Sequence, residues 1–345
     1  MRRRVPVGQH GSVRPISLPP VPYDATAVRP DWSALPAGLR DAVAARLGGP
    51  PVAVRVTGAG FTRGFAAVVE TADGRPVFLK AASLDTQRHL VDWYAHEAAI
   101  LARLPAGLPV PRPRWALTEA GWYALCLDAV DGRTPGLPWD PAELDATLAA
   151  YARVAAALAE PPAELVTLGL PHLADLARDD ILWWGEVAAG REPTPELPPW
   201  ARDRLPELVA LESRLPAYAG DAGPDHRVGL IHCDLRVDNV LIDRDGRAWI
   251  CDWNWLCHGP AWFDLAGFLI TGYASGLDAD VAFATHPAAA GAPPDALDVT
   301  LAALSGYFLT SAAAGPSTAS PHIRSHQRWS GEQALGWLAA RRGWD

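Results

Sequence analysis

Residues 231–253 read IHCDLRVDNVLIDRDGRAWICDW, and this stretch decides the fold. It contains the pattern His-x-Asp-x-x-x-x-Asn, an apolar run, an Asp-Arg-Asp-Gly turn, a second apolar run and a further aspartate. The runs 240–242 and 248–251 are predicted to pair as antiparallel strands around the Asp-Gly turn. This pairing would bring Asn239 roughly opposite Asp252, so that two polar side chains meet at one end of a rigid hairpin.

The chemistry that suits this arrangement is phosphoryl transfer from a nucleotide. Such a reaction needs a carboxylate at the attacking hydroxyl and oxygen ligands for magnesium, all held on rigid elements. Asn239 and Asp252 offer hard oxygen donors for the metal. Asp234 lies one short loop away, on the side where an acceptor would approach. The alternative, that these residues only cap strands and turns, fits single positions but not the complete string.

A single lysine supports the same interpretation. The chain has 30 lysine and arginine residues together, and only Lys80 is a lysine. It lies in the predicted strand 77–80. Lysine is a compact point charge with three rotatable donors, which suits a tight cleft where one cation must meet both phosphates and a carboxylate. In the predicted helix 90–101, Glu97 falls on the apolar stripe, where a buried carboxylate requires a cation. We therefore expect Lys80 to pair with Glu97; the alternative is that both residues lie in solvent.

A glycine-rich loop precedes this strand. The predicted strands 52–57 and 65–70 flank Gly58, Gly60 and Gly64. Glycines let backbone N–H groups approach phosphates closely. No Gly-Lys-Ser/Thr follows and no helix begins there, which excludes a Walker loop. An ordinary glycine-rich hairpin is the alternative.

The order of these features resembles the eukaryotic-like protein kinase fold. Within that fold it looks like the aminoglycoside phosphotransferase branch, which includes choline-kinase-like enzymes. The resemblance extends from about Val52 to the C-terminal helices. It implies an α+β bilobal fold with a small N-terminal antiparallel-sheet lobe and a larger, mainly helical C-terminal lobe.

The resemblance implies roles on the nucleotide side of the site. Lys80 would bind the α- and β-phosphates, and Glu97 would anchor Lys80. The glycine loop would cover the phosphates through Gly58, Gly60 and Gly64. Backbone groups of a hinge, at Leu127 and Ala129, would meet the nucleobase.

It also implies roles on the catalytic side. Asp234 would be the catalytic aspartate, with His232 beside it among the catalytic residues. Asn239 and Asp252 would hold magnesium, and Asp264 would be a buried structural brace for the catalytic loop.

The departures from protein kinases indicate a small-molecule substrate. Cys233 occupies the position where protein kinases carry arginine, and Asp-Trp-Asn replaces Asp-Phe-Gly at Asp252. Asp264 follows twelve positions after Asp252, which is too close for an activation loop. We expect a magnesium-dependent O-phosphotransferase that moves the γ-phosphoryl group of ATP or GTP to a small-molecule hydroxyl. The alternatives are a catalytically silent nucleotide-binding regulatory module, or nucleotidyl transfer on the same fold.

Length and composition fit two lobes. The chain has 345 residues, of which 49% are hydrophobic, enough for a large core. The turn-rich stretch after the strand at 122–127 divides it. We expect four segments, namely an extended N-terminal lead-in at 1–30, an N-lobe at 31–127, a hinge at 128–132 and a C-lobe at 133–345.

Charge and cysteine content narrow the partners. The net charge is −9 and no long basic stretch occurs, which disfavours nucleic acid but is compatible with a cationic acceptor. The sequence contains no long apolar run without charges, so we expect no membrane span. The four cysteines lack metal-site spacing and are expected to be reduced thiols of a cytoplasmic protein. Oligomeric state is not predictable from these features.

The acceptor pocket is the least defined part of the prediction. In the family, helices of the C-lobe supply it, often with acidic and aromatic side chains. Candidates are Asp179, Asp180, Trp183, Trp184 and Glu186 on one predicted helix, with Trp255 and Trp262 after the metal aspartate. Tryptophan is more often a core residue than a ligand platform, and the acceptor itself stays open.

Overall fold

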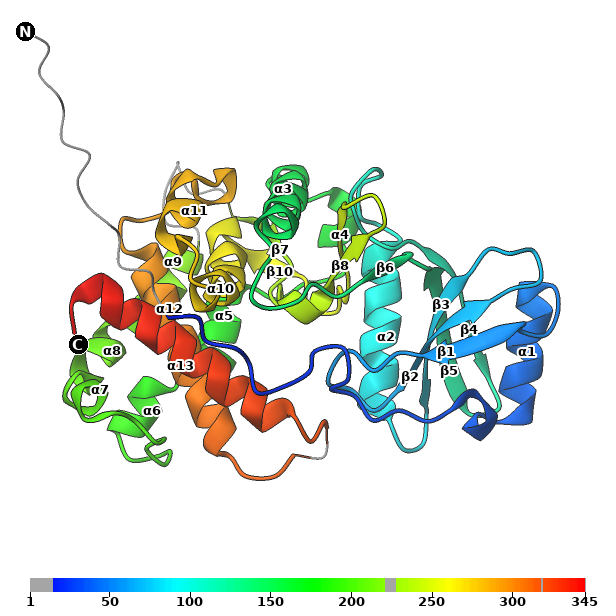
Figure 1. The fold of residues 1–345 in the computed structure, drawn as a ribbon, viewed down its shortest axis with the longest axis horizontal. Helices are drawn as coiled ribbons and strands as arrows, with labels where there is room; N and C mark the ends of the chain where they lie inside the picture. The colour runs from blue at the N-terminus through cyan, green and yellow to red at the C-terminus, as the bar shows by residue number, and fades with distance from the viewer. Residues whose placement is uncertain (1–14, 221–227, 318, 345) are drawn as a thin grey trace, which may run out of the picture.

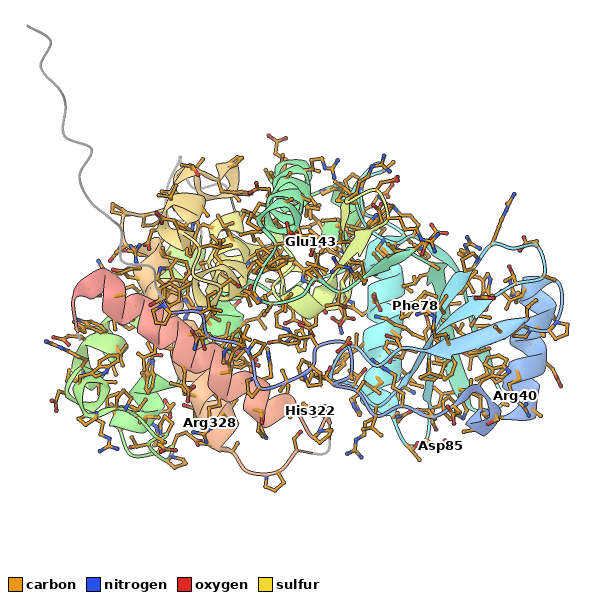
Figure 2. All side chains as sticks on the ribbon, viewed as in Figure 1. Arg40, Phe78, Asp85, Glu143, His322 and Arg328 are labelled. Atoms are coloured by element: carbon orange, nitrogen blue, oxygen red, sulfur yellow. The ribbon has the colours of Figure 1, made fainter. Side chains whose placement is uncertain are left out.

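The computed structural model describes residues 15–220, 228–317 and 319–344. Two lobes lie side by side, one built on a sheet and the other mainly helical (Figure 1). Side chains fill the space between the ribbons of both lobes (Figure 2). The predicted bilobal α+β architecture is confirmed. Residues 1–14 of the predicted lead-in lie outside the described residues.

The smaller lobe contains a five-stranded antiparallel sheet. Its strand order is β1-β2-β3-β5-β4. The strands are β1 (Ala53–Val56), β2 (Phe65–Glu70), β3 (Val77–Ser83), β4 (Pro113–Glu119) and β5 (Trp122–Asp128). Lys80 lies on the central strand, opposite Ala66 of β2 and Leu125 of β5. A side chain at this position is fixed by neighbours on both sides.

Two helices cover opposite faces of this sheet. A short 3-10 turn, η1 (Trp32–Ala34), leads into α1 (Ala37–Leu47), whose Leu39 and Val43 pack against Leu79. On the other face α2 (Arg88–Leu101) packs through Leu90 and Tyr94 against Ala82. In Figure 1, α2 is on the side of the sheet nearer the helical lobe. Because side chains alternate along a strand, Lys80 shares the α2 face with Ala82.

The larger lobe begins after β5, and the proposed hinge 128–132 extends from the last residue of β5 to the first residue of β6. Its first half contains β6 (Gly132–Arg133), α3 (Pro141–Leu158), α4 (Ala163–Val166), α5 (Leu173–Leu176), η2 (Ala177–Ile181), α6 (Trp184–Ala188), α7 (Pro199–Asp203), α8 (Leu205–Glu212) and α9 (Leu215–Ala219). Its second half contains β7 (Gly229–Ile231), η3 (Val237–Asn239), β8 (Val240–Asp243), β9 (Ala248–Ile250), β10 (Cys257–Gly259), α10 (Ala261–Ala274), α11 (Ala279–Thr285), η4 (Pro287–Ala289), α12 (Ala296–Ala313) and α13 (Ile323–Arg342).

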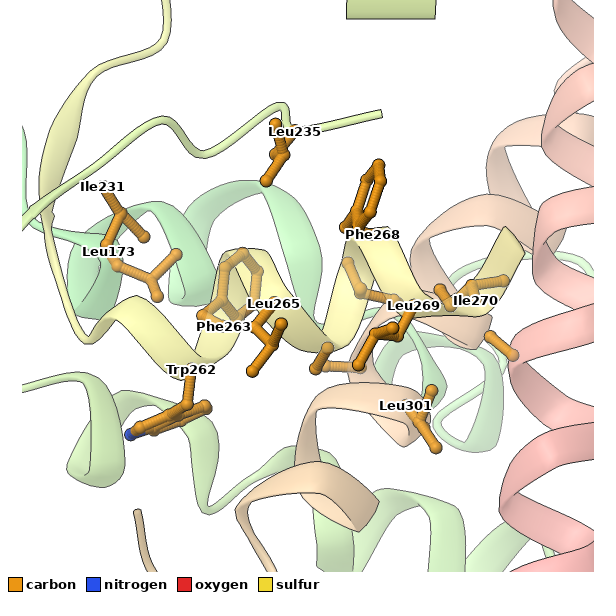
Figure 3. Close-up of a cluster of buried hydrophobic side chains, with 14 of the residues drawn as sticks. Leu173, Ile231, Leu235, Trp262, Phe263, Leu265, Phe268, Leu269, Ile270 and Leu301 are labelled. Atoms are coloured by element: carbon orange, nitrogen blue, oxygen red, sulfur yellow. The ribbon is translucent and has the colours of Figure 1, made fainter. Parts of the chain in front are cut away.

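The core of this lobe forms around α10, whose apolar side chains meet Leu173, Ile231 and Leu301 (Figure 3). Helix α12 is long and apolar enough to cross a membrane by composition alone. However, it packs against α13, α10 and α8, and its Asp298 is paired with Arg341. These contacts make α12 the central core helix of the lobe.

Several predicted elements occur where the periodicity placed them. Strand β2 has the predicted bounds. Helix α3 begins after Asp140, which caps it by accepting from Ala142 N at 2.8 Å. The hairpin β8–β9 pairs Val240 with Ile250 in the predicted antiparallel sense.

One predicted helix is wrong. The segment from Asp179 to Glu186 is broken, because η2 ends at Ile181 and the chain is extended at Leu182. Helix α6 then starts at Trp184. The carboxylate of Glu212 accepts hydrogen bonds from the N–H groups of Trp184 (3.1 Å) and Gly185 (2.6 Å), which favours a new helix start.

Residues 15–31 form an N-terminal strap without helix or strand. The strap runs along α13 and crosses to the sheet lobe (Figure 1). On the helical lobe, the Tyr23 hydroxyl lies 2.9 Å from Nδ1 of His326. On the sheet lobe, the Thr26 hydroxyl donates to the carbonyl of Gly60 at 2.7 Å. The described part of the predicted lead-in, residues 15–30, is therefore a packed connection between the two lobes.

Candidate active site

A cleft between the lobes contains most of the predicted site residues. The cavity has a volume of about 310 Å³, and both lobes line it. Its size falls in the range of small-ligand pockets. Predicted residues that line it are Gly60, Lys80, Glu97, Leu127, Asp234, Asn239 and Asp252. Sites more than 150 positions apart in the chain thus share one cavity.

Lys80 connects the two lobes electrostatically. Its Nζ lies 2.7 and 2.9 Å from the Glu97 carboxylate oxygens and 2.9 Å from Oδ1 of Asp252. Burial lowers the pKa of Lys80, but the carboxylates of Asp252 and Glu97 outweigh burial and raise it. Lys80 is therefore charged. The expected pairing with Glu97, which is 1% exposed, is present.

The hairpin positions Asn239 and Asp252. The N–H of Cys251 donates to the carbonyl of Asn239 at 2.8 Å, so Asp252 follows directly after the paired residues. The Asn239 amide nitrogen donates to the Asp234 carbonyl (2.7 Å) and to Oδ2 of Asp234 (3.1 Å). The amide oxygen is then the atom of Asn239 available to a cation. Burial raises the pKa of Asp252, but Lys80 outweighs it and lowers that pKa below its usual value.

This donor set fits magnesium when phosphate is present. The described residues hold no group of three or more His, Cys, Asp or Glu side chains that could bind a metal alone. Magnesium usually takes one or two protein oxygens together with substrate phosphates. Asn239 and Asp252 both line the cavity and carry two oxygens of this kind.

Asp234 is held by a residue that the sequence analysis did not single out. Arg236 Nη1 lies 2.9 Å from Oδ1 of Asp234, and its Nη2 lies 3.1 Å from Oδ2 of Asp238. Burial raises the pKa of Asp234 to about 7, while Arg236 acts in the opposite direction. In the sequence, Arg236 lies two positions from Asp234 and two from Asp238, and this alternation of opposite charges could have indicated the cluster.

Asp264 braces the loop that carries Asp234, as expected. Its carboxylate accepts from the N–H of His232 (2.7 Å), the N–H of Cys233 (2.8 Å) and the hydroxyl of Tyr151 (3.1 Å). Cys233 has φ +63°, a conformation that a non-glycine residue adopts only at a cost. The buried carboxylate therefore stabilises a turn that the chain would otherwise disfavour.

His232, which the resemblance placed among the catalytic residues, lies behind the walls of the cleft. Its side chain is completely buried and lines neither of the two cavities described here. Nε2 lies 2.9 Å from the carbonyl of Cys251, and the N–H of Asp234 donates to Nδ1 at 3.3 Å. The ring also packs edge-on against Trp253. These contacts tie the loop that carries Asp234 to the β8–β9 hairpin.

The three glycines of the loop differ in role. Gly60, with φ +88°, lines the cavity as predicted. A Cβ at Gly58 would lie 2.5 Å from the carbonyl of Asp24, and one at Gly64 would overlap the hydroxyl of Tyr94. Gly58 and Gly64 therefore permit close packing against the strap and α2, and neither of them lines the cavity.

Arg29 of the strap also faces the cleft. It donates to the carbonyls of Gly64 (2.7 Å) and Ala59 (2.8 Å) and to the Thr62 hydroxyl (3.2 Å). It lines the same cavity as Lys80, and its Nε is buried without a hydrogen-bond partner in the described part of the chain. No motif marked this residue, because its partners lie more than 25 positions away.

At the hinge, Leu127 lines the cavity and is buried, whereas Ala129 does not line it. Asp128 and Val130, on either side of Ala129, line the cavity. Phe78 of β3, opposite Leu127 in the sheet, adds an apolar surface to the same cavity (Figure 2).

A second cavity of about 500 Å³ lies on the other side of Asp234. Among the predicted acceptor residues, Asp180, Trp183 and Trp255 line it. The others do not. Trp184 and Trp262 are buried core residues, Glu186 is paired with Arg191, and Asp179 is exposed outside the lining.

Comparisons with known proteins agree with this geometry. The sequence profile of the phosphotransferase enzyme family matches residues 60–297. Among curated proteins, no sequence matches the chain.

Three solved structures illustrate the similarity of the fold. Aminoglycoside phosphotransferase APH(4)-Ia is 13% identical with a TM-score of 0.57, over 88% of this chain and 98% of that one. A thermostable mutant of the same enzyme was solved in a ternary complex with AMP-PNP and hygromycin B. It is 16% identical with a TM-score of 0.57, over 89% of this chain and 100% of that one. A putative fructosamine-3-kinase from Haemophilus somnus 129PT is 13% identical with a TM-score of 0.51, over 86% and 97%.

Proposed function

We propose, since this chain belongs to the phosphotransferase enzyme family, that it moves the γ-phosphoryl group of ATP or GTP to a hydroxyl of a small molecule. The chain is a small-molecule phosphotransferase; the nucleotide, the metal and the residue roles are the proposal. The observation that carries it is the contact of Lys80 with both Glu97 and Asp252 in the cavity that Asp234 and Asn239 also line.

The nucleotide occupies the cleft between the lobes. Phe78, Leu127 and Leu241 offer apolar surface to the base. Lys80 and Arg29 are the cations at the phosphate end. The structurally similar APH(4)-Ia mutant was crystallised with AMP-PNP and hygromycin B, which supports a nucleotide co-substrate here.

Asn239 and Asp252 would hold magnesium beside the phosphates. The metal would supply neutralisation of the phosphate charge. Lys80 contributes a second, fixed positive charge, because Glu97 and Asp252 keep it protonated and oriented. Preorganised charge of this kind stabilises a transition state without reorganisation.

Asp234 acts on the acceptor. Its Oδ1 is held by Arg236 and its Oδ2 by Asn239, so the carboxylate has a fixed direction. It accepts the proton of the acceptor hydroxyl while that oxygen bonds to the γ-phosphorus. The bond between the γ-phosphorus and the β,γ-bridging oxygen breaks, and the nucleoside diphosphate leaves. A pKa of about 7 is suited to a general base near neutral pH.

A binding experiment tests the metal assignment. We expect Asp252→Ala to lose metal-dependent nucleotide binding, measured by titration calorimetry with and without magnesium. Asp245→Ala, an exposed aspartate in the same hairpin, is the matched control and keeps wild-type affinity. Equal magnesium dependence in wild type and Asp252→Ala would refute the ligand role.

Two other functions share this fold. A silent regulatory module would bind nucleotide without turnover, and a nucleotidyl transferase would add a nucleotide instead of a phosphate. Product mass separates both from phosphorylation.

A further inference from the structure

The second cavity has mostly apolar walls. Side chains from η2, α10 and α12 surround it, and they include Ile181, Phe263, Leu304 and Phe308. Asp234 lies at the boundary with the nucleotide cleft and lines both cavities. A molecule in the second cavity can thus present a hydroxyl to Asp234 while its remaining surface meets carbon.

Few charges of this cavity are free to bind a cation. Three carboxylates line it, but Asp234 is held by Arg236, and Asp264 accepts from the loop backbone. Burial lowers the pKa of His326 to about 3, so this ring is neutral. Asp180 is the one lining carboxylate, among the described residues, without an engaged side chain. A ligand with several ammonium groups would therefore leave most of them unpaired, which is costly near Arg236.

Two partly exposed tryptophans, Trp183 and Trp255, line this cavity. Trp255 is 44% exposed, although it is large and apolar, and it lines both cavities. Its ring lies 5.7 Å from that of Trp93, which supports it from the nucleotide side. The Trp183 indole N–H donates to the carbonyl of Asp180 at 2.8 Å, which fixes that ring. Oriented, partly exposed aromatic rings are surfaces for the apolar face of a ligand.

One hydroxyl inside the cavity lacks a hydrogen-bond partner. Tyr307 lines the cavity, and no described residue accepts from or donates to its hydroxyl. Burial raises its pKa, and the Asp234 carboxylate raises it further, so the ring remains a neutral donor. A few placed polar groups in an apolar pocket fix ligand orientation.

We propose that the acceptor is a ring-bearing alcohol with a broad apolar face and at most one cationic group. Its apolar face lies against Trp183 and Trp255, its hydroxyl meets Asp234, and a single ammonium group, where present, pairs with Asp180. Tyr307 donates to a second oxygen of the ligand. This inference rests on the proposed function, and it excludes hydroxyl-rich polycations as good acceptors.

Calorimetric binding with full-length Asp234→Asn, magnesium and AMP-PNP tests the proposal without turnover. The probes are hygromycin B, as a polar aminated sugar, and three apolar alcohols with one amine each: propranolol, quinine and erythromycin A. We expect at least one of the three to bind about tenfold more tightly than hygromycin B. The proposal is overturned if hygromycin B binds at least as tightly as each of the three apolar alcohols. It is also overturned if none of the three binds.

Variants locate the binding surface. Trp183→Ala and Trp255→Ala should each weaken the best apolar probe at least about fivefold. Trp249→Ala removes a half-buried tryptophan outside both cavities and leaves the affinity unchanged. Trp255→Phe, which keeps an aromatic face, should restore most of the affinity lost in Trp255→Ala. Unchanged affinity in both alanine variants overturns the assignment of the platform.

The same probes separate this inference from the proposed function. Wild-type enzyme, magnesium and ATP are incubated with the best binder, and the product mass is measured. Tight binding without a phosphate-sized gain contradicts the proposed function but leaves the ligand class intact. A gain on hygromycin B alone supports the function and overturns the ligand class.

Discussion

Replacing Arg29 with alanine tests whether the N-terminal strap contributes to nucleotide binding. The guanidinium donates three hydrogen bonds to the glycine loop, at 2.7, 2.8 and 3.2 Å. Hydrogen bonds from charged groups contribute about 1.5–3 kcal/mol each when they are buried. Since Arg29 is only half-buried, water can replace it at the loop carbonyls and the net loss is smaller than the sum. We expect about 1.5–3 kcal/mol in total.

The loss of this binding energy should lower the affinity for ATP more than the affinity for adenosine. In the proposed binding mode, Arg29 orders the loop above the phosphates and adds positive charge next to Lys80. The base would lie against Phe78 and Leu127, which line the same cavity. The affinity for magnesium-ATP should fall about 10- to 100-fold in Arg29→Ala. The affinity for adenosine should change little.

Titration calorimetry with magnesium-ATP, ADP and adenosine measures these differences. Arg88→Ala is the matched control, because Arg88 is an exposed arginine on α2 that pairs only with Asp92 among the described residues. Unchanged ATP affinity in Arg29→Ala would refute the reasoning. An equal loss for ATP and adenosine would mean that Arg29 braces the loop without acting on the phosphates.

Two further predictions concern Asp234 and its support. Burial raises the pKa of Asp234 to about 7, and only the ionised form accepts a proton, so turnover should fall as the pH drops below about 7 and level off above it. A pH profile of kcat that is flat through this range would contradict the role of Asp234 as base. Asp264→Ala leaves the N–H groups of His232 and Cys233 buried without an acceptor. Each unsatisfied group lowers the free energy of unfolding by about 1–3 kcal/mol. Urea unfolding should show a loss of about 2–6 kcal/mol, and a wild-type midpoint would exclude the brace.

The parts of the site that were predictable share a local signal. The pairing of Lys80 with Glu97 followed from an apolar helix stripe that contains one carboxylate and a strand that contains the only lysine. The β8–β9 hairpin followed from two apolar runs around an Asp-Gly turn. Periodicity and turn chemistry extend over a few residues, so they locate elements well.

The parts that were missed depend on contacts between distant segments. The break before α6 is stabilised by Glu212, which lies 28 positions after Trp184, so helical spacing alone could not locate it. Arg29 reaches the glycine loop across 30 to 35 positions. His232 belongs to the motif, yet its burial against Trp253 excludes it from the cleft. Sequence patterns identify chemically suitable residues, but burial decides which of them meet a ligand.

The central claim is phosphate transfer that depends on Asp234. Mass spectrometry of acceptors incubated with enzyme, magnesium and ATP or GTP tests it most directly, with Asp234→Asn beside wild type and Asp203→Asn, an exposed aspartate on α7, as the control. The account predicts a phosphate-sized mass gain on one acceptor with wild type and Asp203→Asn, and almost none with Asp234→Asn. An equal gain with Asp234→Asn, or a gain the size of a nucleotide, would contradict it.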